Sequence, residues 1–344
     1  MFSLLSSTRR FLIGTKSFQS IRTMASYNPK SIVFNHTCLR VKDPKVSVDY
    51  YTKNFGLKLI ATKQFPELKF DLYFLSFNDA ETGSPFDREG VLELTHNYGT
   101  ENDPDYKINN GNVEPYRGFG HICFSVDNIQ KSEENLLANG VKFQKKLSDG
   151  RQKNIAFALD PDNYWIELIE HGISKVENKT ELSTYKFNHT MIRVKDPVAS
   201  LKFYREVLGF KLLSTSVHEN AKFTLYFLGY NHEDSFEENS LTRNDQASLE
   251  SVLELTWNWG TEKEEGQIYH NGNVQVEGAE GNTQGYGHIG ISVDNAEAWT
   301  KELEEKWGDQ VTWGLKFNQG KLKNIAFIRD PDNYAIEILP SVGV

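Results

Sequence analysis

The chain has 344 residues, of which 38% are hydrophobic and 25% are charged, a composition typical of soluble globular proteins. Its length suffices for two domains with substantial cores, and its formal net charge of −9 argues against a nucleic-acid-binding surface. No apolar run approaches the roughly 20 residues that a membrane span needs. We therefore expect a soluble protein without nucleic-acid or membrane partners.

The N-terminal segment, residues 1–30, differs in composition from the rest of the chain. It contains five basic residues, six serines and no acidic residue, as mitochondrial transit peptides do. A disordered start without a targeting role would have the same composition, and Met24 could begin a shorter cytosolic form. We predict a disordered or mitochondrial-targeting segment over residues 1–30 and a cytoplasmic or mitochondrial location, or both.

From residue 31 onward the pattern predicts strand–helix–strand units. Asp43 and Pro44 begin an amphipathic helix that ends at Gly56. Strands are expected around this helix over residues 32–41, 58–62, 70–77 and 91–96. A second unit follows a polar loop, with a helix over residues 129–138 and strands near residues 121–126, 141, 155 and 164.

The second half of the chain repeats the first. Four segments recur in the same order, and the separation between the two copies grows along the chain; they start at Asn35 and Asn188, Val91 and Val252, Gly118 and Gly285, and Asn154 and Asn324. A repeat of this length indicates a duplicated domain. We expect two βαβββ units in each half, with domains over residues 31–172 and 183–344 and a linker over residues 173–182.

The duplication singles out eight ionisable residues. Only four of the nine histidines keep a histidine at the matching position, and two glutamate pairs stand in the same repeated blocks; the pairs are His36 and His189, His121 and His288, Glu93 and Glu254, and Glu167 and Glu337. Strand alternation places them on polar faces opposite apolar ones. Unpaired carboxylates in a cavity are costly, so we predict two sites, each with two histidines and two glutamates around a divalent cation. Such donors suit Zn²⁺, Ni²⁺, Co²⁺ or Mn²⁺.

The motifs together resemble glyoxalase I (lactoylglutathione lyase) of the vicinal oxygen chelate (VOC) superfamily. They read N-H-T-C-L-R-V-K-D-P from Asn35, L-E-L-T-H-N-Y-G-T-E from Leu92, N-N-G-N from Asn109, R-G-F-G-H-I from Arg117 and D-P-D-N-Y-W-I-E-L from Asp160. The resemblance covers about residues 34–340, in both halves of the chain. The tandem arrangement of the two halves is similar to that of the two-domain fungal form. The resemblance implies an α+β fold of tandem VOC modules, with four βαβββ units in curved, partly open sheets, and a monomer with two active sites between its halves.

The resemblance also implies which residues share a metal and what they do. One site would take His36, Glu93, His288 and Glu337, and the other His189, Glu254, His121 and Glu167. The substrate implied is the hemithioacetal of methylglyoxal and the cosubstrate glutathione, and the product is S-D-lactoylglutathione. A metal, with Zn²⁺ favoured, would stabilise an enediolate while a glutamate moves the proton, and this base would be Glu167 or Glu337.

Two groups of residues are candidates for binding glutathione. Arg40, Arg193, Asn97 and Asn258 share strand faces with the predicted ligands, and the resemblance adds Arg117, Lys145, Arg151 and Trp165. In the second half, Gln284 replaces Arg117 and Ala335 replaces Trp165. We therefore predict two unequal sites, with weaker substrate binding at the site that contains Glu337.

Two other interpretations remain open from the residues. Another enzyme of the same superfamily, an extradiol dioxygenase or an epimerase, would share the fold and some ligands, although the dioxygenase iron site needs two histidines and one carboxylate. A non-catalytic VOC protein that binds a small ligand would need neither a metal nor a proton-moving glutamate.

Overall fold

The computed structural model describes residues 26–77, 84–173 and 177–342. Most of the predicted N-terminal segment, residues 1–25, lies outside the described residues, as do residues 174–176 of the predicted linker. The domain boundaries inferred from the repeat therefore stay predictions.

The first half contains two βαβββ units. The first unit comprises β1 (Val33–Val41), α1 (Pro44–Phe55), β2 (Lys58–Phe65), β3 (Phe70–Ser76) and β4 (Val91–Asn97). The second unit comprises β5 (Phe119–Val126), α2 (Ile129–Ala138), β6 (Lys142–Lys145), β7 (Ala156–Leu159) and β8 (Trp165–Glu170).

The second half repeats this plan, and among the described residues it has one additional helix, α4. The third unit comprises β9 (Lys186–Val194), α3 (Pro197–Lys202), the π-helical turn η5 (Phe203–Val207), β10 (Lys211–His218), β11 (Phe223–Gly229), α4 (Arg243–Ala247) and β12 (Val252–Asn258). The fourth comprises β13 (Tyr286–Val293), α5 (Ala296–Trp307), β14 (Thr312–Leu315), β15 (Ala326–Arg329) and β16 (Ala335–Pro340). Single 3₁₀ turns lie at Pro29–Ser31, Pro66–Leu68, Thr100–Asn102, Leu182–Thr184, Thr261–Lys263 and Gly308–Gln310. The predicted α+β class with four βαβββ units is confirmed.

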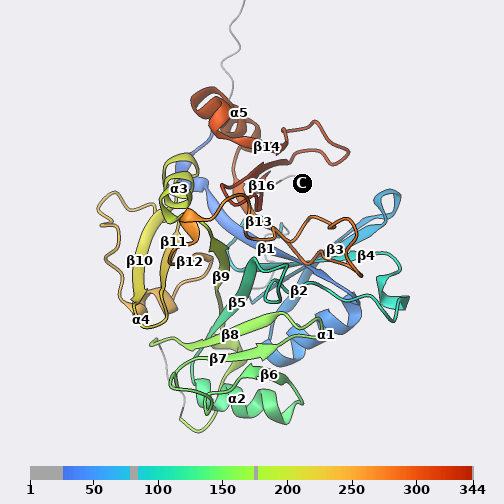
Figure 1. Cartoon of the computed structure of the whole chain (residues 1–344), viewed down its shortest axis with the longest axis vertical. Coiled ribbons are helices and arrows are strands. Elements are labelled where there is room, and N and C mark those ends of the chain that lie inside the picture. The colour runs from blue at the N-terminus through green and yellow to red at the C-terminus, as the bar shows by residue number, and fades with distance from the viewer. Residues whose placement is uncertain (1–25, 78–83, 174–176, 343–344) are drawn as a thin grey trace, which may run out of the picture.

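Each of the two eight-stranded sheets combines one unit from each half. The strand orders are β14-β15-β16-β13-β1-β4-β3-β2 and β10-β11-β12-β9-β5-β8-β7-β6. Antiparallel pairing of β1 with β13, and of β5 with β9, joins the halves at the centre of each sheet, so blue and red elements share one sheet in Figure 1. The first unit thus pairs with the fourth and the second with the third, and neither sheet is made by one half alone.

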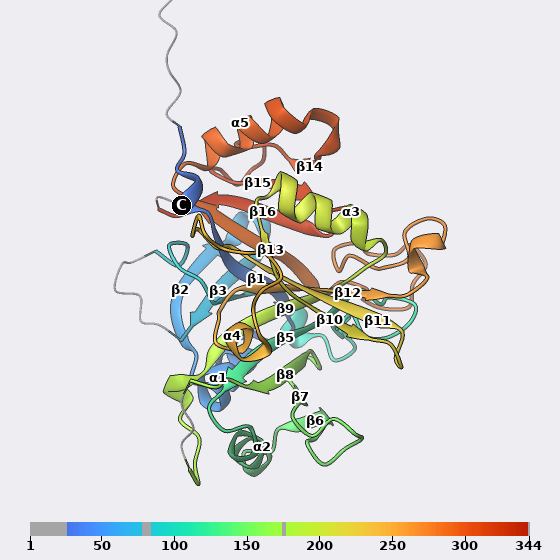
Figure 2. The same cartoon turned by 90° about the vertical axis from the view of Figure 1, so that its left-hand side faces the viewer.

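Local sequence signals begin and end the helices. Asp43 caps α1 by accepting a hydrogen bond from the backbone N–H of Lys45, and Pro44 occupies the first turn. Gly56 ends this helix with a φ of 78°, a left-handed conformation that glycine adopts without steric cost. Figures 1 and 2 show α5 and α2 at opposite ends of the molecule, each beside the outer strands of a different sheet.

Buried tyrosine–aspartate contacts join neighbouring units. The hydroxyl of Tyr51 on α1 donates to Oδ2 of Asp160 at 2.9 Å, and Tyr204 donates to Asp330 at 2.9 Å. Each aspartate stands in the D-P-D-N-Y turn of a unit that belongs to the other sheet. These contacts hold the two sheets together and thereby fix the relative position of the polar strand faces.

The described part of the N-terminal segment packs on the second half. Tyr27 contacts the ring of Trp299 on α5 at 6.2 Å between centroids and donates a hydrogen bond to Glu302. The backbone N–H of Asn28 donates to Asp294 at 3.0 Å. Residues 27–30, which lie inside the predicted 1–30 segment, therefore belong to the folded part of the protein.

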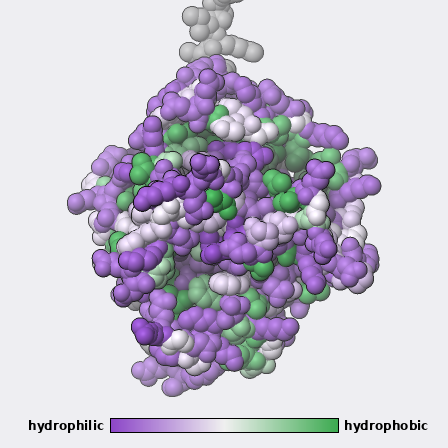
Figure 3. Space-filling model, in the orientation of Figure 1, coloured by the Kyte–Doolittle hydropathy of each residue, from purple (hydrophilic) through white to green (hydrophobic). Residues whose placement is uncertain are grey.

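The surface facing the viewer in Figure 3 is mostly hydrophilic, and apolar residues form only small groups on it. Within the described residues, no helix combines the length and the apolar character needed to cross a membrane.

Candidate metal centres and substrate pockets

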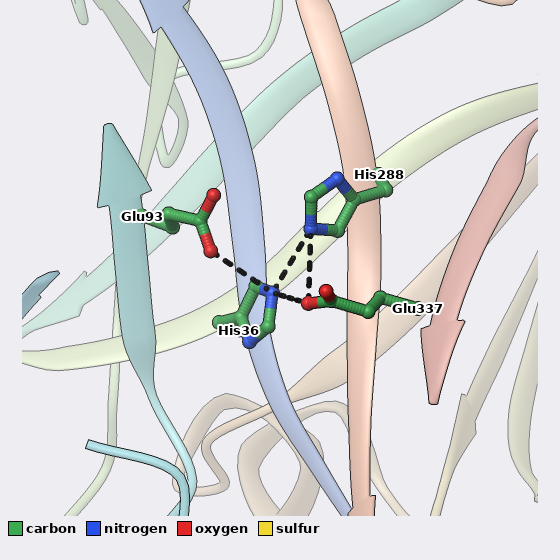
Figure 4. A group of neighbouring side chains, drawn as sticks. All are labelled: His36, Glu93, His288 and Glu337. Carbon is green, nitrogen blue, oxygen red and sulfur yellow. Dashed lines mark hydrogen bonds and ion pairs between the residues drawn. The ribbon is translucent and has the colours of Figure 1, made fainter. Parts of the chain in front are cut away.

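Four side chains converge on the polar face of the first sheet. Nε2 of His36 lies 3.1 Å from Nε2 of His288, 3.3 Å from Oε2 of Glu93 and 3.4 Å from Oε2 of Glu337 (Figure 4). All four donor atoms lie within 4.8 Å of one another. We call this group site A.

The second sheet carries a matching group, site B. Nε2 of His189 lies 2.9 Å from Oε2 of Glu167 and 3.0 Å from Oε2 of Glu254, and 3.2 Å from Nε2 of His121. All four residues are buried. Within the described residues, these two groups are the clusters with the spacing of a metal site.

Strand order explains how residues so distant in sequence meet. The four residues of site A come from β1, β4, β13 and β16, which are adjacent at the centre of one sheet. In the register, His36 faces Gly290 and Gly290 faces Glu337, so the side chains of neighbouring strands emerge on the same face. The same relation holds among β5, β8, β9 and β12 at site B.

An asparagine beside the first histidine of each site sets the orientation of the ring. Oδ1 of Asn35 lies 2.7 Å from Nδ1 of His36, while Nδ2 of Asn35 donates to the carbonyls of Pro85 and Arg88. Because the amide nitrogen is committed to two carbonyls, the oxygen must accept the Nδ1–H of the ring. The lone pair of His36 therefore remains on Nε2, directed at the centre of site A. The sequence pattern alone did not indicate this role, although the asparagine precedes the histidine in both repeats.

The two glutamates of each site are held differently. Oε1 of Glu93 accepts a hydrogen bond from Thr95 at 3.3 Å, and Oε1 of Glu254 accepts one from Thr256 at 3.0 Å. No such anchor holds the second oxygen of Glu167 or Glu337 among the described residues. Glu167 and Glu337 are 7% and 8% exposed, against 3% and 4% for Glu93 and Glu254. The pair without an anchor therefore also faces the pockets more openly.

Glu167 and Glu337 are ionised despite their burial. Burial alone would raise the pKa of Glu337, but hydrogen bonds from His288 and His36 outweigh it and lower this pKa to about 2. Burial would likewise raise the pKa of Glu167, but hydrogen bonds from His121 and His189 outweigh it and lower this pKa well below its usual value. Burial would lower the pKa of His189 and His288, but the neighbouring cysteine and glutamates outweigh it and raise this pKa well above its usual value, so in the protein alone these rings balance the carboxylates. A divalent cation bound by the same four side chains would take over this role.

A cavity of about 430 Å³ opens from site B. Four of the predicted glutathione-binding residues line it: Arg117, Trp165, Arg193 and Asn258. Lys145 and Arg151 are not among its lining residues. The ammonium group of Lys145 instead donates to the carbonyls of Gln152 and Ile155, so this side chain holds its own loop together.

A second cavity, of about 390 Å³, opens from site A. Arg40 and Asn97 line it, as predicted residues of this site. Arg329 also lines it, at the position that Leu159 holds in the first half. The sequence did not single out this arginine, because its counterpart Leu159 is apolar and belongs to no predicted site.

Arg40 and Arg193 are largely committed to the protein. The guanidinium of Arg193 donates to the carbonyls of Gly118 and Phe119 and to the side chain of Asn112. Arg40 makes the equivalent bonds to Gly285, Tyr286 and Asn273. These two arginines thus hold the Asn-Gly loops of the opposite half against the pocket walls.

Each sheet is built from two βαβββ units and has two histidines and two glutamates at its centre. This combination of fold and site is that of a protein superfamily built from βαβββ modules with a metal site. The chain belongs to the Glyoxalase/Bleomycin resistance protein/Dioxygenase superfamily, whose family model matches residues 33–168 and 186–338.

Particular relatives narrow this assignment. The chain is 56% identical over 321 residues to glyoxalase I of Saccharomyces cerevisiae, which covers 91% of this chain and 94% of that protein. It is 49% identical over 311 residues to lactoylglutathione lyase of Schizosaccharomyces pombe, covering 89% and 95%. The crystal structure of glyoxalase I from Zea mays matches with a TM-score of 0.64 and 27% identity, over 90% of this chain and 93% of that one. The resemblance to glyoxalase I inferred from the motifs is confirmed.

Proposed function

We propose that this chain is a lactoylglutathione lyase that isomerises the hemithioacetal of methylglyoxal and glutathione to S-D-lactoylglutathione, and so removes methylglyoxal. One observation carries the proposal: two buried centres, each with two imidazoles and two carboxylates, open into cavities in a chain 56% identical to glyoxalase I. A single chain contains both centres, so we propose a monomer with two active sites.

The donor set supports a divalent cation, with Zn²⁺ favoured and Ni²⁺, Co²⁺ or Mn²⁺ as alternatives. His36, Glu93, His288 and Glu337 would hold one ion, and His121, Glu167, His189 and Glu254 the other. A buried cluster of two carboxyl and two imidazole side chains, which bind a metal as carboxylates and neutral rings, fits such an ion. When bound, the cation supplies Lewis-acid stabilisation for negative charge that develops on neighbouring substrate oxygens.

Glu167 and Glu337 would move the proton. The reaction requires a base that takes the proton from C1 of the substrate and returns it to C2. Threonine bonds restrain Glu93 and Glu254, whereas Glu167 and Glu337 have no such restraint among the described residues and face the pockets. This difference supports the assignment of the base to the last glutamate of each site.

Apolar and cationic walls would orient the substrate. The ring of Phe157 contacts His121 at 5.4 Å between centroids, and Phe327 contacts His288 at 5.3 Å, so each centre has an aromatic side that excludes water. At site B, Arg117 and Trp165 line the cavity and would bind the glutathione part. At site A, Arg40 and Asn97 would contribute.

A mitochondrial location, a cytoplasmic one, or both would follow from the composition of residues 1–30. A fusion of these residues to a fluorescent reporter tests this, and we expect part of the reporter in mitochondria. A reporter found wholly in the cytosol would remove the targeting role and leave a cytoplasmic enzyme.

The proposed activity is tested by metal analysis of the purified chain together with the absorbance of S-lactoylglutathione formed from methylglyoxal and glutathione. We expect up to two divalent ions per chain, loss of activity after chelation and recovery when the metal is restored. A Glu167→Gln/Glu337→Gln double variant serves as the control and is expected to be inactive. Oxygen uptake with a catechol, or a metal-free protein that binds glutathione conjugates without turnover, would contradict the proposal.

A further inference from the structure

The connection between β11 and β12 is longer than its counterpart in the first half. β3 ends at Ser76 and β4 begins at Val91, whereas β11 ends at Gly229 and β12 begins only at Val252. We call residues 230–251, which include α4, the α4 segment. Figures 1 and 2 show it beside β10 and β12.

The α4 segment is held firmly against the sheet. The backbone N–H of Leu241 donates to the carbonyl of Leu213 at 3.1 Å, so the segment runs along the outer strand β10. Thr242 and Asp245 form a reciprocal capping box at the start of α4. The side chain of Gln246 accepts a hydrogen bond from Ser214 at 2.9 Å. An anchored segment of this kind can hold a side chain in a defined position.

This segment forms part of the wall of the site B cavity. Leu241, Arg243 and Gln246 line the cavity, whereas none of the described residues 84–90 of the matching connection lines the cavity at site A. Arg243 reaches across to the second unit. When the side-chain amide of Asn154 is oriented with its oxygen toward Arg243, this oxygen lies 3.1 Å from both Nη atoms of the arginine and accepts a hydrogen bond from each. The arginine thus spans the rim of the cavity between two units.

Arg243 differs from the other arginines of this cavity in its partners. Arg193 is committed to three backbone carbonyls and Asn112, and Arg117 lies 3.3 Å from the carboxylate of Glu114. Within the described part of the chain, no carboxylate forms an ion pair with Arg243. The Arg243 guanidinium has five N–H donors, and Asn154 can accept from only two of them. The positive charge and three donors of Arg243 therefore remain for a ligand. A guanidinium in this state is well suited to a carboxylate.

We propose that Arg243 is a substrate-binding residue of site B that pairs with a carboxylate of the thiol cosubstrate, a role that none of the described residues in the matching connection of the first half fills at site A. The inference rests on the proposed function, because the peptide thiol glutathione carries two carboxylates. The greater length of the α4 segment thereby makes site B selective for the anionic end of the substrate, away from the metal centre.

Kinetics of Arg243→Gln test the proposal when one site is silenced. In a Glu337→Gln background, which leaves site B to turn over, we expect Arg243→Gln to raise KM roughly tenfold with kcat within about twofold. In a Glu167→Gln background, which leaves site A, KM is expected to stay unchanged. Arg243→Lys should recover part of the loss, because the charge remains while the fork of donors is lost.

A cosubstrate without carboxylates separates ligand binding from a structural effect. With glutathione esterified at both carboxylates, the Arg243→Gln effect on KM should disappear; an equal rise with the ester would overturn the proposal. Calorimetry with S-hexylglutathione should show roughly tenfold weaker binding at one class of site in Arg243→Gln. Lys202→Gln removes the same charge from the exposed face of α3 and should change neither measurement.

The two proposals fail in different ways. An unchanged KM of Arg243→Gln at an active site B would overturn this inference and leave the enzyme assignment intact. A parent Glu337→Gln chain with no glutathione-dependent turnover and no binding of S-hexylglutathione would overturn both.

Discussion

Oδ1 of Asn35 lies 2.7 Å from Nδ1 of His36 and fixes which nitrogen of that ring carries the proton. Asn188 and His189 repeat the contact at 2.7 Å in the other site, and Asn188 is likewise committed to two carbonyls. Each asparagine therefore orients the ring of a histidine in a candidate metal centre.

Asn35→Ala is expected to weaken metal binding at site A roughly ten- to a hundredfold, the usual cost of losing a hydrogen bond that orients a ligand. Titration of the metal against a chelator should then show one weak and one strong site per chain. Asn188→Ala is the matched control and should weaken site B instead. Equal loss at both sites, or none, would remove this role.

Glu167→Gln and Glu337→Gln should each silence one site and leave the other working. The residual KM is expected to be lower in Glu337→Gln, because the remaining site B has Arg117 and Trp165 in its cavity where the second half has Gln284 and Ala335. Steady-state kinetics of the two single variants measure this difference. Equal KM values for the two variants would contradict the prediction that the sites differ in substrate binding. Arg329 in the cavity of site A would then explain why the two sites bind equally well.

The buried Asp160 predicts a loss of stability as the pH rises through the acidic and neutral range. Burial, together with the charge of Asp162, raises the pKa of Asp160 to about 8. A carboxyl with a folded-state pKa above its unfolded value contributes full stability below the unfolded value and loses it as the pH rises toward the folded one. The free energy of unfolding should therefore fall by up to about 1.4 kcal/mol per pH unit between roughly pH 4 and 8.

Asp160→Asn removes this titration while keeping the size of the side chain. Thermal unfolding at constant scan rate should show the unfolding temperature of the variant rising relative to that of the parent chain as the pH increases from about 5 to 8. Asp330→Asn is expected to behave alike, because burial also raises the pKa of Asp330 to about 8. A constant difference between parent and variant across this range would contradict the prediction.

The first half expressed alone, residues 26–173, should form a homodimer. Without the second half, β1 and β5 lose the antiparallel partners that they have in the full chain. Since β5 is the counterpart of β13, β1 of one copy can pair with β5 of another and cover both exposed edges. Light scattering after size exclusion should give twice the fragment mass, and the full chain should elute as a monomer. A stable monomeric fragment would contradict the prediction.

Much of the candidate site could be predicted from the alternation of side chains along strands and from the duplication of the domain. His36 and Glu93 could be placed on polar strand faces because side chains alternate with a period of two, and the duplication separated them from histidines such as His218 that have no counterpart. The caps of α1 were equally local, since Asp43 and Gly56 act on backbone groups within a few residues.

Tertiary structure decided what lies across the strands. His36 meets His288, which is 252 residues away, because β1 pairs with β13, and periodicity within a strand does not encode the identity of its partner. The placements of Arg243 and Arg329 in different cavities, and the commitment of Lys145 to its own loop, likewise depend on which units pack together. The sequence by itself determined which residues are candidates for the chemistry, and the non-local pairing of strands decided which of them share a cluster.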